Sequence, residues 1–89
     1  MFTSSIKIKD VKSEIGLLVK SYRKGEKLSM QELADKLELS RITIQNLESG
    51  KNFTIDTLLK ALQYFDKLSD FNDFVKGKRS ENEDVESLY

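Results

Sequence analysis

The side chains with the most distinctive chemistry lie within residues 41–46. If this segment is helical, at about 100° per residue, Ile44 and Leu47 point to one side. The other side carries four side chains: Arg41, Ile42, Gln45 and Asn46. A guanidinium group can bond guanine through two atoms, an amide can bond adenine in the same way, and an apolar side chain can contact a thymine methyl group. A solvated surface is the commoner role of a polar helix face, but an apolar Ile42 opposite the core favours a face that reads DNA bases.

Capping signals predict two short helices, of which the second carries this face. Ser29 and Glu32 have the spacing of a capping box, in which the hydroxyl accepts the third amide and the carboxylate accepts the cap amide. The buried side of this helix has three residues: Leu33, Ala34 and Leu37. Ser40 is the expected N-cap of the next helix, which ends at Gly50. Only residues 38–39 separate the two, so we expect a sharply angled helix pair that packs closely around the small Ala34.

Apolar residues at helical spacing predict three further helices. The first begins at the N-cap Asp10 and ends near Lys24, before Gly25. Its apolar positions are Val11, Ile15, Leu18, Val19 and Tyr22. A fourth helix begins at Thr54, and a fifth is capped by Ser69. Their apolar positions are Ile55, Leu58, Leu59, Leu62 and Phe65, then Phe71, Phe74 and Val75.

The two ends of the chain have a different character from residues 10–76, which form the expected domain. Residues 1–9 alternate weakly between apolar and polar side chains, as in a short strand or a loose arm. Residues 77–89 are polar and mostly acidic, and their composition favours disorder. Solvation alone would explain this tail; the alternative is that five of its side chains dock on a basic partner surface. These are Glu81, Glu83, Asp84, Val85 and Leu88.

Composition excludes several classes of chemistry. The 89 residues include no His and no Cys, so neither a zinc finger nor a nucleophile paired with imidazole can form, and no enzyme activity, metal or cofactor is expected. Neither a membrane span nor a signal peptide is apparent, which favours a cytoplasmic protein. The zero net charge conceals an uneven distribution: residues 1–24 have six basic and two acidic side chains, whereas residues 61–89 have four and seven. A basic surface and an acidic end can therefore coexist.

Residues 29–51 resemble the helix-turn-helix of the lambdoid phage repressor and Cro family, often called XRE-type. The matching residues are Leu33, Ala34, Ile44, Leu47 and the segment 47–51 (LESGK). The likeness extends over residues 15–75, with helices in the expected order. It implies an all-α, five-helix, lambda-repressor-like DNA-binding domain with a short N-terminal arm and an acidic C-terminal tail.

The resemblance also implies roles for individual residues. Base contacts fall on Arg41, Ile42, Thr43 and Asn46, with Ser40 and Gln45 at the edge. Phosphate contacts fall on Ser29, Ser49, Lys51 and Asn52. Family members pair an Arg late in the first helix with the Glu that ends the third, here Arg23 and Glu48, and such a pair would help to aim Arg23 at phosphate. The alternative is that these two are unrelated surface charges.

Two positions depart from the family pattern. Met30 stands where Gln often bonds phosphate, which leaves that contact in doubt. Glu38 stands where Gly usually adopts a left-handed conformation, at a cost of about 1 kcal/mol if the geometry is kept. The segment 53–59 (FTIDTLL), then Leu62 and the segment 68–71 (LSDF), resemble the small HipB-like repressor antitoxins that pair with HipA-like kinase toxins.

The implied function is a dimeric, sequence-specific repressor that binds inverted repeats in double-stranded DNA, and it favours an antitoxin that controls its own operon. Leu68, Phe71 and Phe74 exceed what one short helix pair can bury, so they are candidates for the dimer interface, unless they close the monomer core. Three alternatives stay open: a phage-type repressor, a restriction–modification controller, and a protein-interaction module that has lost DNA reading.

Overall fold

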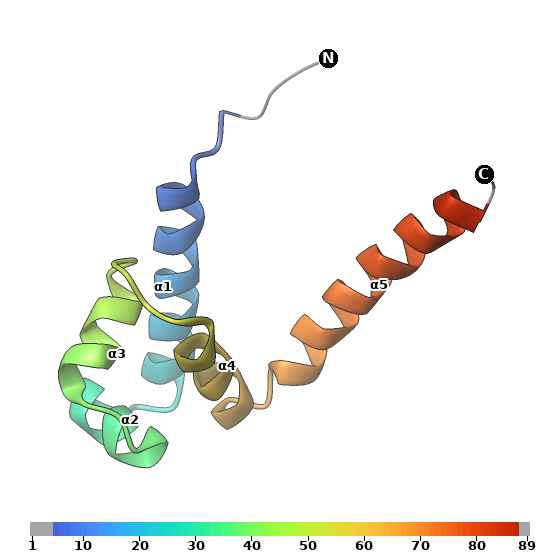
Figure 1. Cartoon of the computed structure of the whole chain (residues 1–89). Helices are drawn as coiled ribbons and strands as arrows, with labels where there is room; N and C mark the ends of the chain where they lie inside the picture. The colour runs from blue at the N-terminus through green and yellow to red at the C-terminus, as the bar shows by residue number, and fades with distance from the viewer. Residues whose placement is uncertain (1–4, 88–89) are drawn as a thin grey trace.

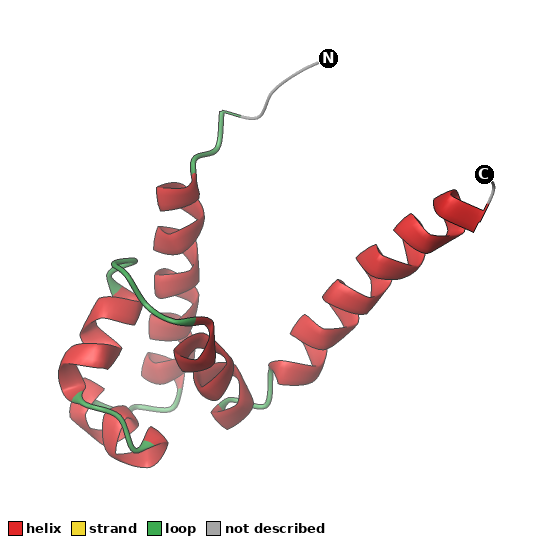
Figure 2. Ribbon diagram, viewed as in Figure 1, coloured by secondary structure: helices red, strands yellow, loops and turns green. Residues whose placement is uncertain are grey.

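The computed structural model describes residues 5–87, which form five α-helices and no strand (Figure 2). The helices are α1 (Ile8–Gly25), α2 (Met30–Leu37), α3 (Arg41–Glu48), α4 (Ile55–Tyr64) and α5 (Leu68–Ser87). The predicted all-α class and the predicted order of five helices are therefore confirmed.

Three of the predicted N-caps are confirmed. The hydroxyl of Ser29 accepts the backbone N–H of Glu32, whose carboxylate accepts the N–H of Ser29 in return. The hydroxyl of Ser40 caps α3 by accepting the backbone N–H of Thr43, and that of Thr54 caps α4 by accepting the N–H of Thr57. Because a short polar side chain at each start satisfies an orphan backbone amide, these three boundaries are encoded locally.

Two predicted N-caps are wrong. Helix α1 starts earlier than expected, with Lys7 as its cap, and Asp10 lies inside the first turn, where its carboxylate accepts the N–H of Lys7 at 2.9 Å. Helix α5 starts at Leu68, so Ser69 lies within it. For residues 1–9 we expected a short strand or a loose arm. Residues 5–7 have no regular structure and Ile8 is already helical, so the described part of this segment does not form the strand; residues 1–4 lie outside the described residues.

The first, second and fourth helices are each followed within two residues by a non-glycine residue at positive φ: Lys27, Glu38 and Asp66. Glu38 thus keeps the left-handed conformation that Gly usually adopts at this position of the family, at φ 57°. In each case the following N–H turns back to the helix; that of Leu39, for example, donates to the carbonyl oxygen of Ala34 at 2.9 Å. After α3 the corresponding residue is Gly50, at φ 73°.

The core lies among α1, α2, α3 and α4 (Figure 1). Its fully buried side chains are Val19, Leu33, Ala34, Ile44, Leu47 and Ala61. Leu37, Leu58, Leu62 and Phe65 complete it. Not every predicted apolar position is buried, however. Val11 and Leu18 of α1 and Ile55 of α4 are all exposed, because they lie beside the buried face of their helix and no other element covers them.

Helix α5 projects away from the core (Figure 1). Among the residues of α5 whose side chains are described, Leu68 and Phe71 of its first turns pack against the core. The helix then continues to Ser87, which contradicts the disorder expected for residues 77–87. Its exposed half has helix-forming side chains and intrahelical ion pairs, such as Arg79 with Glu83 at 2.8 Å, which favour a helix without tertiary contacts.

Candidate nucleic-acid interface

Gly16 sets the separation of α1 and α3. A Cβ atom at this position would overlap the backbone carbonyl of Glu48 and lie 2.7 Å from the carbonyl oxygen of Leu47. Any side chain larger than hydrogen would therefore push α3 away from α1. Sequence reasoning missed this role, although a Gly inside an otherwise helical pattern is a signal of close packing.

A buried ion pair joins the same two helices. Arg23 Nε donates to Glu48 Oε2 at 2.6 Å, and its Nη2 donates to Oε1 at 2.9 Å. The third guanidinium nitrogen, Nη1, donates to the carbonyl oxygen of Leu28 at 2.8 Å. The predicted Arg23–Glu48 pair thus exists, and the hydrogen bonds to Glu48 raise the pKa of Arg23 above its usual value although burial opposes the shift. The pair fixes both the distance and the rotation of α3 relative to α1.

The same geometry does not fit the phosphate contact expected of Arg23. Its side chain is only 8% exposed, and all three of its nitrogens already donate to protein oxygens. In this position the guanidinium group fixes the placement of α3 relative to α1. We therefore leave Arg23 out of the phosphate-contacting set.

The base-reading candidates on α3 fall into two groups. Arg41, Ile42 and Gln45 are exposed, Ile42 to 64%, on the side opposite the buried Ile44 and Leu47. An apolar side chain so exposed on a short helix has no packing role within the described chain. The three side chains together present a guanidinium group, an amide and an alkyl group at one surface, which matches the chemistry of base edges.

Thr43 and Asn46, the other two candidates, are half-buried. The hydroxyl of Thr43 shares a hydrogen bond of 2.8 Å with that of Ser40, which also accepts the N–H of Thr43 at 3.1 Å. Asn46 lines a shallow pocket of about 310 Å³ with Asn52 and the start of α4. Both side chains lie at the rim of the exposed face.

The phosphate candidates lie at both ends of the helix pair. Ser29 is exposed at the start of α2, and Ser49, Lys51 and Asn52 follow α3. The hydroxyl of Ser49 donates to the carbonyl oxygen of Gln45 at 2.8 Å. It can therefore donate to a phosphate oxygen only if its side chain rotates. Lys51 projects an exposed ammonium group, and its backbone N–H closes the end of α3 on Asn46 at 2.9 Å.

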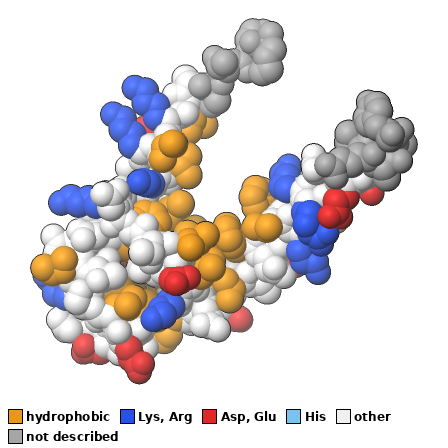
Figure 3. Space-filling view, viewed as in Figure 1, with side chains coloured by type: hydrophobic (Ala, Val, Ile, Leu, Met, Phe, Trp, Pro, Cys, Tyr) orange, Lys and Arg blue, Asp and Glu red, His pale blue; other side chains and the backbone are white. Residues whose placement is uncertain are grey.

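Lys12 is a further cation at this edge that sequence reasoning missed. Its Nζ lies 3.5 Å from Oδ1 of Asn52, so a residue of α1 joins the loop after α3. Gly50 makes this approach possible, because a Cβ there would lie 2.9 Å from the Cα of Ser13. Forty positions separate Lys12 from Asn52, and no local pattern could have indicated their contact. Figure 3 shows Lys and Arg side chains gathered over the N-terminal part of α1.

The helix-turn-helix family profile matches residues 19–71, which is more than half of the chain. The chain belongs to this XRE-type helix-turn-helix family. Members of the family are DNA-binding transcription regulators, and α2 and α3 are the helix-turn-helix of this one. None of the curated proteins matches the chain. Within the described residues, no helix is both long and apolar enough to cross a membrane.

The matched segment includes the Arg23–Glu48 pair and all of α2, α3 and α4, and it stops in the first turns of α5. Gly16 and the projecting part of α5 lie outside it. The family match therefore includes the helix-turn-helix and the Arg23–Glu48 pair but not Gly16, and the roles of the candidate DNA-contacting residues rest on the geometry.

Proposed function

We propose that this regulator is a sequence-specific repressor that places α3 in the major groove of its operator. The observation that carries this proposal is the exposed surface of Arg41, Ile42 and Gln45 on a helix whose orientation two buried contacts fix. A helix that reads bases must hold its side chains within a fraction of an ångström, and Gly16 and the Arg23–Glu48 pair supply that rigidity. Thr43 and Asn46 contact bases at the rim of the same face.

Phosphate contacts position α3 on the duplex. Ser29 lies exposed at the N-terminus of α2, where the helix dipole favours an anion. Ser40, Lys51 and Asn52 border α3, and Lys12 adds a cation beside Asn52. Such contacts give affinity and salt dependence without sequence preference. Met30 occupies a position beside Gln45 and Ser49 where it offers no hydrogen bond to phosphate.

The repressor acts as a homodimer on an inverted repeat, because one α3 of eight residues reaches only a few base pairs. Of the three interface candidates, Leu68 and Phe71 pack partly on the monomer core, whereas Phe74 is 61% exposed. An aromatic side chain with that exposure on a projecting helix is suited to a contact with a second subunit.

Within this class, we propose the role of an antitoxin that represses its own operon and binds a HipA-like kinase toxin. Its support is the resemblance of the segment 53–59, of Leu62 and of the segment 68–71 to small HipB-like repressor antitoxins. A kinase gene beside this one, and a complex of the two purified proteins, would support the assignment.

DNA selection from a random pool, followed by gel-shift titration at several salt concentrations, tests DNA reading. Truncation of Arg41 to Ala should cost about 1–3 kcal/mol of binding free energy and relax the preference at one base position. Lys51→Ala should weaken binding to all sequences and reduce the salt slope by about one.

Arg79→Ala is the matched control, because it removes an exposed guanidinium group from α5. It should leave the selected sequence and the affinity unchanged. Selection of no consensus sequence, or an Arg41→Ala protein that binds the selected site as tightly as the parent, would overturn the proposed reading face.

A further inference from the structure

A small hollow lies where α1, α2 and α3 meet. This hollow, the Lys20 hollow, has a volume of about 150 Å³ and is lined by Lys20, Met30, Gln45, Glu48 and Ser49. Gln45 also belongs to the exposed face of α3 that we propose to read bases, so the hollow and that face adjoin each other. A group bound in the Lys20 hollow therefore lies at the edge of the DNA that α3 contacts.

The positive charge of this hollow comes from Lys20. The residue is half-buried, and it shares the hollow with Met30, whose side chain packs against the core. A lysine beside apolar surface lays its alkyl stem on that surface and keeps its ammonium group toward solvent. The partial burial of Lys20 thus limits the positions that its charge can take.

No carboxylate of the described residues neutralises Lys20. Glu48 also lines the hollow, but its two oxygens accept from Arg23 at 2.6 and 2.9 Å, and its side chain is only 2% exposed. On α1, the positions three and four residues away from Lys20 carry no acidic side chain: Gly16, Leu17, Arg23 and Lys24. The ammonium group is therefore available to an anion from outside the chain.

The other side chains of the hollow offer an anion little. Met30 has no donor, and the hydroxyl of Ser49 already donates to the carbonyl oxygen of Gln45 at 2.8 Å. The amide of Gln45 can donate but carries no charge. Binding of an anion in this hollow thus depends on Lys20.

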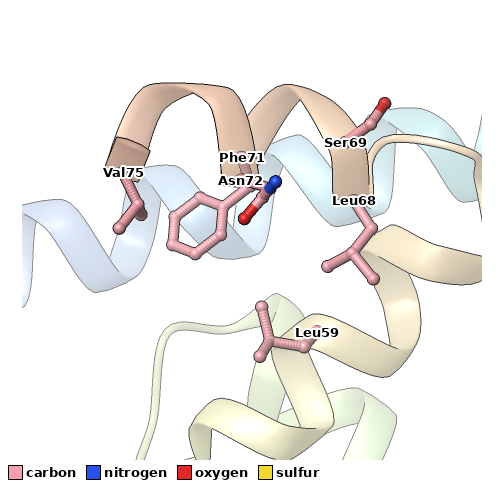
Figure 4. A pocket seen from close by; sticks show the side chains of 6 residues that line it. All are labelled: Leu59, Leu68, Ser69, Phe71, Asn72 and Val75. Atoms are coloured by element: carbon pink, nitrogen blue, oxygen red, sulfur yellow. The ribbon is translucent and has the colours of Figure 1, made fainter. Parts of the chain in front are cut away.

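Two larger hollows of the surface do not combine these properties. The groove of about 540 Å³ between α4 and α5 has no charged side chain in its lining (Figure 4). The hollow of about 390 Å³ between α2 and α4 has Lys36 and Lys60, but the carboxylate of Glu38 lines it as well. The Lys20 hollow has an unneutralised cation next to the exposed face of α3.

Lys20 and Lys12 lie on either side of the contact between α1 and α3. Lys12, Gly16 and Lys20 follow one another at intervals of four residues, so they lie along one flank of α1. Gly16 contacts the backbone at the end of α3, and Lys12 reaches Asn52 in the loop beyond it. The two lysines are about 12 Å apart along the helix axis, with the end of α3 between them.

We propose that Lys20 binds a backbone phosphate of the operator in the Lys20 hollow. The proposal deepens the DNA contact of the proposed function and rests on it. When the side chains of α3 face base edges in the major groove, the sugar–phosphate backbone runs past the ends of the helix pair. Lys20 then gives α1 a direct contact with this backbone, which the buried guanidinium group of Arg23 does not make.

Removal of the charge of Lys20 tests the proposal. Lys20→Met keeps most of the alkyl stem, and binding is measured by gel-shift titration at several salt concentrations, on the selected operator and on an unrelated duplex of the same length. The salt slope should fall by about one, and the affinity for both duplexes should fall by about fivefold to tenfold at about 0.1 M salt. Lys20→Arg keeps the charge and should retain the parental slope.

The ratio of the two affinities separates a phosphate contact from a structural role. A variant that only displaces α3 would lose its preference for the operator over the unrelated duplex, whereas loss of a phosphate contact leaves this ratio unchanged. A lower ratio with an unchanged salt slope therefore overturns the proposal.

Neutral methylphosphonate linkages, placed one at a time in the operator, locate the contact. The parent should lose affinity at each phosphate that it contacts. Lys20→Met should become insensitive at one of these positions and remain sensitive at the others. If the same positions affect both proteins equally, Lys20 contacts none of them.

Lys76→Met is the matched control, because it removes a lysine from the part of α5 beyond the family match. It should bind both duplexes like the parent. An equal fall in the salt slope for Lys76→Met and Lys20→Met would show a general effect of net charge and overturn the proposal. Parental binding by Lys20→Met overturns the Lys20 contact alone, whereas a parent that selects no DNA sequence removes the proposed function itself.

Discussion

Gly16 of α1 contacts the backbone of Glu48 at the end of α3, with no room between them for a Cβ atom. The contact joins two helices that lie far apart in the sequence, and it is made at the residue whose side chain also binds Arg23. Placement of α3 thus depends on the missing side chain of Gly16 and on the buried Arg23–Glu48 ion pair.

Gly16→Ala should destabilise the fold and weaken DNA binding, because the new methyl group forces α3 outward. Overpacking of this kind costs about 1–3 kcal/mol of unfolding free energy. Chemical denaturation and gel-shift titration measure the two effects. Gly25→Ala is the matched control, since a Cβ there has no neighbour within 4 Å. It should leave stability unchanged or raise it slightly; equal losses from both variants would contradict the close approach.

Removal of one partner of the Arg23–Glu48 pair should be costly. Glu48→Ala leaves a buried guanidinium group without its carboxylate, at about 3–5 kcal/mol of unfolding free energy. Replacement of both partners, by Arg23→Met with Glu48→Leu, should recover most of this loss. Denaturation midpoints of Glu48→Ala and of the double variant, each against the parent, provide the comparison.

The same double variant tests whether Arg23 affects DNA binding only through the position of α3 or also through a phosphate contact. If Arg23 acts only through the position of α3, the double variant that regains stability should also regain DNA affinity with the parental salt slope. A salt slope lower by about one would show that Arg23 contacts a phosphate after all.

Glu38→Gly should stabilise the protein, because Glu38 pays a steric cost for its left-handed conformation at φ 57°. We expect a gain of about 1 kcal/mol in unfolding free energy, with a melting temperature higher by about 4–8 °C. Lys36→Gly, within the same helix, should instead lose about 1 kcal/mol. A Glu38→Gly protein that melts at or below the parental temperature would show that Glu38 bears no strain.

Acid should weaken the start of α2. The backbone N–H of Ser29, followed by its side chain, holds the pKa of Glu32 below its ordinary value. A lowered pKa in the folded state contributes stability above the ordinary value, and this contribution is lost as the pH falls through the folded pKa. Melting temperatures from about pH 6 to about pH 3 should therefore fall less steeply for Glu32→Gln than for the parent.

Ser29→Ala serves as the control for this pH dependence. It removes the hydroxyl but keeps the backbone N–H, which is the larger cause of the shift. Most of the parental pH dependence should persist in it. Identical slopes for Glu32→Gln and the parent would exclude a role for the capping box in acid stability.

Features with a local cause could be predicted from the sequence. Ser29, Ser40 and Thr54 cap their helices through residues three positions away, and the tight turn leaves Glu38 little choice of conformation. The exposure of Ile42 follows from helical periodicity once Ile44 is buried. The Arg23–Glu48 pair required more than periodicity, and the family resemblance supplied it.

Features that depend on the packing of distant segments could not be predicted in this way. Periodicity placed Leu18 and Val19 on one apolar side of α1, but the core covers only Val19. The contact of Lys12 with Asn52 depends on how α1 crosses the loop after α3. The polar composition of residues 77–87 led us to expect disorder in place of the second half of α5. Composition does not register the spacing of opposite charges, and the pairs of Lys78 with Glu81 and of Arg79 with Glu83 favour a helix.

Helix α1 packs against α3 through Gly16 and Arg23. In the proposed homodimer, the position of α3 relative to α1 therefore sets the distance between the two proposed base-reading faces. A change that moves α3 outward should alter the number of base pairs between operator half-sites, while the bases preferred within each half-site remain the same. Operator spacing thus depends on the residues that support α3, and operator sequence depends on its exposed side chains.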